Sequence, residues 1–115
     1  MNTAGAVPTI VTCHANADFD AFAAMIAARR LYPGSFLLFP GTQDRGLQAI
    51  VQDDRLRKAY GFIELAEMDF SAIRCLVAVD TRQRDRLSHV APLLDREDVR
   101  VEVWDHHPPT PNDIR

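Results

Sequence analysis

The stretch TIVTCHANADFDA, residues 9–21, joins a run of apolar residues to a segment rich in alanine. Residues 9–13 are apolar at nearly every position, which is typical of a strand that is buried on both faces of a parallel sheet. From Asp20 onward, apolar residues recur at spacings of three and four, which predicts a helix. That helix should end near Tyr32, because Pro33-Gly34 is a strong stop signal.

The same change of pattern recurs along the rest of the chain. Three further strands are predicted, at residues 35–39, 75–79 and 99–104. Residues 44–60 predict one amphipathic helix with a solvated charged face, and a break within it is left open. Residues 88–94 predict a short helix, whereas 63–70 fit either a short strand or a helical turn.

Strands that alternate with helical segments require crossover connections, because parallel neighbours cannot be joined by a tight turn. The expected fold class is therefore a three-layer α/β/α domain with a mainly parallel sheet. Residues 1–115 should form one such domain or part of one, with 1–8 as a frayed lead.

Composition excludes several classes of protein. No apolar run approaches the ~20 residues of a membrane span, and the amino terminus lacks a secretory signal pattern. Cys13 and Cys75 lie far apart within apolar runs, as expected for buried thiols in a reducing compartment, so the cytoplasm is predicted. The net charge of −3 argues against a general nucleic-acid binder but is compatible with a small phosphorylated ligand held by metal ions.

Residues that commonly bind divalent cations follow three of the predicted strands. His14 ends the first strand, with Asp18 and Asp20 in the loop behind it, Asp80 ends the third, and residues 105–107 (Asp-His-His) follow the fourth. Because open α/β sheets bind ligands at the carboxyl ends of their strands, these groups should converge. So many carboxylates would repel one another without cations. A His and Asp set without thiolates suits Mn²⁺, with Mg²⁺ or Co²⁺ as competitors.

Several of these residues also have a purely structural interpretation. An Asp that precedes a helix is most often an N-cap, and this alternative stays open for the loop at residues 14–20. Asp105 fits a turn residue equally well. The arginines Arg82, Arg84 and Arg86 fit a solvated turn or, less commonly, a patch that faces phosphate.

Three motifs together resemble the DHH phosphoesterase superfamily. They are His14-x-x-x-Asp18-x-Asp20-Ala21, the lone strand-end Asp80, and Asp105-His106-His107-Pro108. They occur in the family's order, each after an apolar strand, and span nearly the whole chain. The superfamily includes exonucleases, nano-RNA and cyclic-dinucleotide phosphodiesterases, pyrophosphatases and exopolyphosphatases. The resemblance also extends to modules joined to CBS and tRNA nucleotidyltransferase domains in bacterial multidomain proteins.

The resemblance implies two neighbouring Mn²⁺ ions and a role for each motif residue. The implied metal ligands are His14, Asp18, Asp20, Asp80 and His106. Asp80 would bridge the two ions, and His107 would face the substrate phosphate as a catalytic residue. Asp105, the other implied catalytic residue, would orient a ligating imidazole. The implied reaction is hydrolysis of a phosphodiester or phosphoanhydride, in a phosphorylated small molecule or a short nucleic acid, by water that two metals activate.

Two other functions remain open from the sequence. One is a non-catalytic metal- or nucleotide-binding regulatory module of a larger multidomain protein, and the other is a structural α/β unit with empty acidic loops. The family pattern continues with a fourth Asp motif and a basic C-terminal domain, but this sequence stops at Arg115. We therefore expect further domains as partners, weak activity or none from this chain alone, and self-association into a homo-oligomer through uncovered apolar surface.

Overall fold

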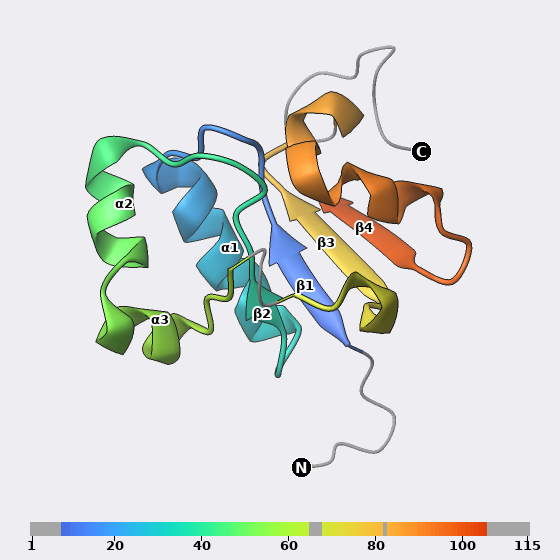
Figure 1. Cartoon of the computed structure of the whole chain (residues 1–115), viewed down its shortest axis with the longest axis horizontal. Helices are drawn as coiled ribbons and strands as arrows, with labels where there is room; N and C mark the ends of the chain where they lie inside the picture. The colour runs from blue at the N-terminus through green and yellow to red at the C-terminus, as the bar shows by residue number, and fades with distance from the viewer. Residues whose placement is uncertain (1–7, 65–67, 82, 106–115) are drawn as a thin grey trace.

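The computed structural model describes residues 8–64, 68–81 and 83–105. At its centre is a four-stranded parallel sheet in the order β2-β1-β3-β4 (Figure 1). The strands are β1 (Thr9–Thr12), β2 (Phe36–Leu37), β3 (Cys75–Val79) and β4 (Arg100–Trp104). The predicted parallel sheet, with strands from these four runs, is confirmed.

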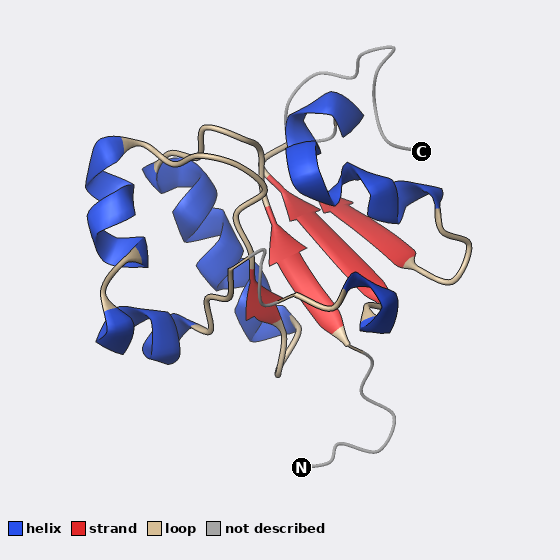
Figure 2. Ribbon diagram, viewed as in Figure 1, coloured by secondary structure: helices blue, strands red, loops and turns tan. Residues whose placement is uncertain are grey.

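Helices cover both faces of this sheet (Figure 2). On one side lie α1 (Phe19–Leu31), α2 (Arg45–Val51) and α3 (Asp54–Tyr60); on the other lie the 3₁₀ segments η2 (Phe70–Ala72) and η3 (Arg84–Asp95). The fold is therefore the predicted three-layer α/β/α arrangement. Within the described ranges, no helix combines the length and the apolar content that crossing a bilayer requires.

Alternating side chains of the buried strands pack into two separate apolar clusters, one on each face of the sheet. Val11 and Val77 belong to the cluster on the α1 side, where Phe22 and Met25 pack. Their strand neighbours Ile10, Leu76 and Ala78 belong to the cluster beneath η3. This two-sided burial explains why the strands read as continuous apolar runs.

An aspartate N-cap begins each of the helices α1, α2 and α3. The side chains of Asp18, Asp44 and Asp53 accept hydrogen bonds from backbone N–H groups in the first turns of α1, α2 and α3. The α1 helix lies within one residue of its prediction at each end. The Asp53 cap starts a new helix, which breaks the predicted helix over 44–60 in two. Gly61 ends α3 with a φ of 75°, a conformation that suits glycine.

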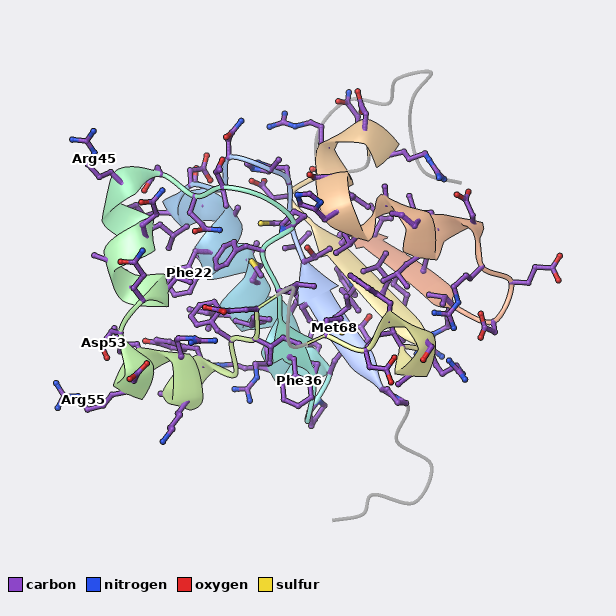
Figure 3. All side chains as sticks on the ribbon, in the orientation of Figure 1. Phe22, Phe36, Arg45, Asp53, Arg55 and Met68 are labelled. Atoms are coloured by element: carbon purple, nitrogen blue, oxygen red, sulfur yellow. The ribbon has the colours of Figure 1, made fainter. Side chains whose placement is uncertain are left out.

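Most charged residues of α2 and α3 form a solvated face, as predicted, although Arg57 is half-buried. Arg45 and Arg55 are exposed and extend away from the sheet, whereas Phe22 points into the aromatic cluster beneath them (Figure 3). That cluster joins Phe22 to Phe39 and Phe62, with ring centroids between 5.4 and 6.5 Å apart.

The structure differs from the sequence-based expectation in two elements. Strand β2 has two residues instead of five, and Phe62 forms a single parallel bridge to Leu37 on its outer side. Within η3, two short helices meet at Ser88, whose φ of 48° and ψ of −118° are not helical; the second, at 89–95, lies close to the helix predicted at 88–94, and the first is an additional turn that starts at Arg84. In the second helix, the buried residues Val90 and Leu93 are three positions apart, which is the period of a 3₁₀ helix.

Candidate metal and phosphate site

The carboxyl ends of β1 and β3 bring three predicted ligands together. His14 lies two residues beyond β1, Asp80 directly follows β3, and Asp18 precedes α1. One ligand atom from each of these side chains lies within 4.8 Å of the other two. His14, Asp18 and Asp80 therefore form a triad able to hold a metal ion.

The hydrogen bonds of His14 point its Nε2 atom into the triad. His14 is buried, and its Nδ1 lies 2.9 Å from the Ala15 carbonyl oxygen, which can only accept. We therefore assign the proton to Nδ1, so that Nε2 presents its lone pair. Nε2 then faces the Asp80 carboxylate at 3.3 Å, an arrangement that a cation between the two would stabilise. The donor set thus fits a divalent ion.

Asp18 fits both interpretations that the sequence left open, those of a helix N-cap and of a metal ligand. Its Oδ1 accepts a hydrogen bond from the Ala21 N–H at 2.9 Å and so caps α1. A carboxylate has a second oxygen, and the side chain also belongs to the triad. The helix cap fixes the position of this carboxylate, so one residue can cap the helix and bind a cation.

The backbone around the triad is strained. Asp80 and Asn16 both adopt a φ of 59°, a region that residues other than glycine seldom occupy. The Asp80 N–H donates to the Trp104 carbonyl oxygen at 3.0 Å, which ties the strained residue to β4. Strain of this kind persists where neighbouring contacts enforce it, and it gathers at functional sites.

Backbone hydrogen bonds hold the loop at 14–18 from two sides. The Ala15 N–H donates to the Arg86 carbonyl oxygen at 2.8 Å, and the Ala17 N–H donates to the Thr42 carbonyl oxygen at 2.9 Å. The Asp44 N–H returns a bond to the Ala17 carbonyl oxygen at 2.8 Å. These bonds fix the loop without any ligand, which is the rigid support that a binding site requires.

The triad opens into a cleft of about 440 Å³. The cleft is lined by His14, Asp18, Asp20, Ala24, Asp80, Arg86 and Trp104. Asp20 therefore faces the same cleft as the triad but is outside the group of atoms within 4.8 Å. Three carboxylates and one guanidinium leave this lining with a net negative charge, so an anion would bind here only after a cation.

Cys13 lies next to His14 but is not a candidate nucleophile. Its side chain is fully buried, and its Sγ donates to the His14 carbonyl oxygen at 3.4 Å. Burial, together with the charges of Asp80 and Asp18, raises the pKa of the thiol far above its usual range. The reactive thiolate is therefore not populated near neutral pH.

The third motif is only partly described. His106 and His107 lie outside the described residues, so their predicted roles remain predictions. Asp105 directly follows β4 but belongs neither to the triad nor to the cleft lining. Its role in orienting an imidazole also remains a prediction.

Of the two described arginines in the stretch after β3, Arg84 and Arg86, only Arg86 lines the cleft. Its Nη2 lies 3.3 Å from Nδ1 of His14, whereas Arg84 pairs with Asp95. Arg82 lies outside the described residues. The sequence did not single out Trp104, although an aromatic residue at a strand end directly before Asp105 was a usable signal.

The chain is similar to part of a much longer enzyme. An A-adding tRNA nucleotidyltransferase from Geobacter sulfurreducens is 38% identical over 110 residues, which cover 92% of this chain but 12% of that protein. No family model matches the chain, and no solved structure matches it.

This relative corrects the functional prediction. Its name states nucleotidyl transfer, so the prediction of a hydrolase acting on phosphodiesters or phosphoanhydrides is wrong. The physical reason is that the motifs specify a cation and a phosphate. Metal sites with these ligand types serve phosphatases and polymerases alike. A ligand pattern therefore does not tell whether water or another hydroxyl group attacks the phosphorus.

Proposed function

We propose that this chain is a domain of a nucleotidyl-transferring enzyme that binds phosphate in the presence of a divalent cation. The observation that carries the proposal is the triad of His14, Asp18 and Asp80, with Nε2 of the buried His14 directed at a carboxylate. The relative supports the wider assignment, because it is named an A-adding tRNA nucleotidyltransferase. Because the match covers 12% of that relative, we propose that this chain corresponds to one domain of such an enzyme.

The donor set favours Mn²⁺, with Mg²⁺ and Co²⁺ as alternatives. One imidazole nitrogen and carboxylate oxygens, without a thiolate, suit these ions better than a structural zinc. A divalent cation there would supply positive charge to bind and polarise a phosphoryl oxygen. From the three motifs, which include His106 and His107, we also propose that this is a DHH-type domain. That proposal does not include hydrolysis as the activity.

Arg86 is the residue we assign to the phosphate itself. With the proton of His14 on Nδ1, the Arg86 guanidinium next to it finds no acceptor there and can turn its N–H donors to the cleft. A guanidinium binds phosphate with two parallel hydrogen bonds. The phosphorylated partner would be a small molecule or the end of a short nucleic acid.

The test of the cation site uses two helix caps as a matched pair. Asp18→Asn and Asp44→Asn both keep a capping side chain, since Asn caps as well as Asp. Isothermal calorimetry with MnCl₂ should show binding to the wild-type chain and to Asp44→Asn, and its loss in Asp18→Asn. Equal Mn²⁺ affinity in the two variants would overturn the assigned site.

Phosphate binding is tested with pyrophosphate as the probe. We expect pyrophosphate to bind in Mg²⁺ and not in EDTA, and Arg86→Ala to weaken that binding while leaving cation affinity unchanged. Arg84→Ala is the control, because Arg84 pairs with Asp95 outside the cleft. Pyrophosphate binding that is equally strong in EDTA would contradict the proposal.

A further inference from the structure

The cleft beside the triad has an aromatic wall. Trp104 lines it together with Arg86 and Asp80, and 51% of its surface is exposed. We propose that Trp104 stacks on the base of a nucleotide whose phosphate is bound at the triad and Arg86. This inference rests on the proposed function and assigns its ligand class: a phosphate that carries a nucleobase.

Side-chain hydrogen bonds hold the indole in place. Trp104 Nε1 donates to the Tyr32 hydroxyl oxygen at 3.2 Å, and the Tyr32 hydroxyl donates to the Glu102 carboxylate. This relay joins the end of α1 to two residues on the same side of β4. An indole fixed along its edge keeps its face available, and less freedom is lost when a base stacks on it.

The backbone also links the indole to the triad. Trp104 pairs in register with Val79, the residue before Asp80, and its carbonyl oxygen accepts the Asp80 N–H. Trp104, which lines the cleft, and Asp80, which belongs to the triad, thus lie at the ends of adjacent strands. Because both are tied to the sheet, their separation is fixed before a ligand binds.

The chemistry of the cleft favours a nucleotide over a bare phosphate. Inorganic phosphate or pyrophosphate would use the cation and Arg86 and would leave the indole without a role. Stacking accepts any base, because every base has a π-face. The cleft volume of about 440 Å³ also falls within the usual range of small-molecule sites.

The only tryptophan of the sequence makes the test direct. In Mg²⁺, ADP should change the intrinsic tryptophan fluorescence strongly, whereas pyrophosphate should bind with little change. By calorimetry, Trp104→Leu should weaken ADP binding about 5-fold to 100-fold and leave pyrophosphate binding within about twofold of wild type. Phe36→Leu is the control, since Phe36 is exposed to a similar extent but does not line the cleft.

The outcomes separate this inference from the proposed function. If pyrophosphate and ADP both bind in Mg²⁺ and Trp104→Leu weakens neither, stacking on Trp104 is overturned while the phosphate site stands. If neither ligand needs the cation, the proposed function itself fails. A third arm, in which a 5′-phosphorylated trinucleotide replaces ADP, distinguishes an RNA end from a free nucleotide as the source of the base.

Discussion

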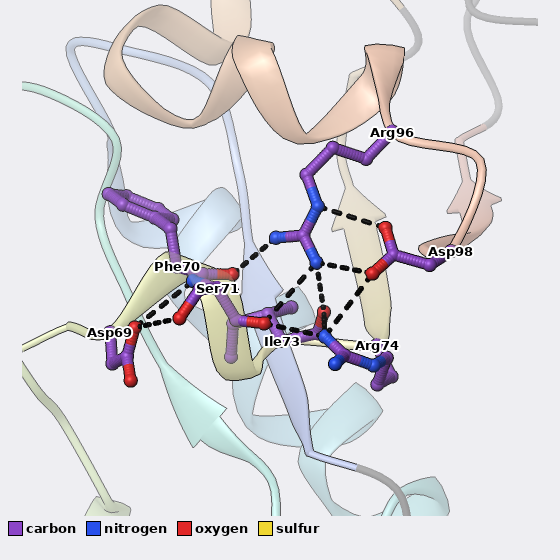
Figure 4. Close-up of polar contacts among 7 residues, drawn as sticks. All are labelled: Asp69, Phe70, Ser71, Ile73, Arg74, Arg96 and Asp98. Atoms are coloured by element: carbon purple, nitrogen blue, oxygen red, sulfur yellow. Dashed lines mark hydrogen bonds and ion pairs between the residues drawn. The ribbon is translucent and has the colours of Figure 1, made fainter.

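The amino and carboxyl edges of the sheet differ in whether their charged side chains are balanced by opposite charges. At the amino edge, the Arg96 guanidinium donates to both oxygens of Asp98, at 2.9 and 2.7 Å, and to the carbonyl oxygen of Phe70 (Figure 4). Asp98 also pairs with Arg74 at 3.4 Å. Every charge in this network, which we call the amino-edge network, has an opposite charge or a carbonyl oxygen as partner.

The carboxyl edge has the reverse balance. Three carboxylates share the cleft with one guanidinium, and the residues Asn16, Asp80 and Ser88 around it have positive φ angles. The amino-edge network can stabilise the fold by itself, because its donors and acceptors satisfy one another. The carboxyl edge carries unbalanced negative charge that a cation would offset, so of the two edges it is the one that suits a charged ligand.

The largest expected effect comes from removing one acid at each edge. Asp80→Asn should lower Mn²⁺ affinity by more than the about 10- to 100-fold that loss of an outer partner of a metal ligand costs. Stability without metal should not fall, because Asn tolerates a positive φ and a repulsive charge is removed. Asp98→Asn should do the opposite, reducing stability and leaving Mn²⁺ affinity unchanged. Calorimetry measures the Mn²⁺ affinity, and urea unfolding measures the stability. If both variants change in the same way, the proposed difference between the two edges is wrong.

Loss of Arg96 should be the next largest effect. Arg96→Ala removes hydrogen bonds to Asp98 and to backbone carbonyl oxygens that precede β3. We expect a lower free energy of unfolding in urea and an unchanged Mn²⁺ affinity. Arg55→Ala is the control, since Arg55 extends into solvent (Figure 3), and it should change stability by no more than about 0.5 kcal/mol. A stability loss of equal size in the control would show that the amino-edge network contributes nothing special.

A smaller gain in stability is expected at the carboxyl edge. Ser88 has a φ of 48° and a ψ of −118°, a conformation that glycine adopts without a Cβ clash. Ser88→Gly should therefore raise the free energy of unfolding by about 1 kcal/mol. Chemical denaturation measures this value. A loss of stability would mean that the bend in η3 carries no strain.

The smallest expected effect is the acid dependence of the amino-edge network. Hydrogen bonding to Arg96 holds the pKa of Asp98 below its ordinary value of 3.8. A lowered pKa in the folded state stabilises the protein above the ordinary pKa, and that contribution is lost as the pH falls through the lowered value. The stability difference between wild type and Arg96→Ala should thus be constant from pH 7 to 5 and shrink below about pH 4. A difference that stays constant down to pH 2 would contradict this coupling.

The sequence predicted the strands and helices well, because burial of an element requires apolar residues at regular positions. Residues 9–13 and 75–79 are apolar on both faces, and their ends placed His14 and Asp80 at one edge. Arg86 and Trp104 were harder to assign to a site. Arg86 belongs to an arginine-rich stretch that also fits a solvated turn. Trp104 ends an edge strand whose alternating pattern marks one face as more exposed but does not indicate a site. The type of reaction left no record, because the same ligands serve several phosphoryl acceptors.

Gly61 sets a constraint that should be visible in the variation of related sequences. A Cβ on Gly61 would lie 2.7 Å from the guanidinium of Arg29, which reaches the Ser35 carbonyl oxygen at the start of β2. A guanidinium is the far end of a flexible side chain and can move aside, so the lack of space alone does not exclude a Cβ at position 61. The positive φ at Gly61 disfavours other residues whatever the space, so related sequences should keep glycine at position 61 while position 29 varies. A turn that depends on its backbone angle should thus change more slowly in evolution than the side chain that lies against it.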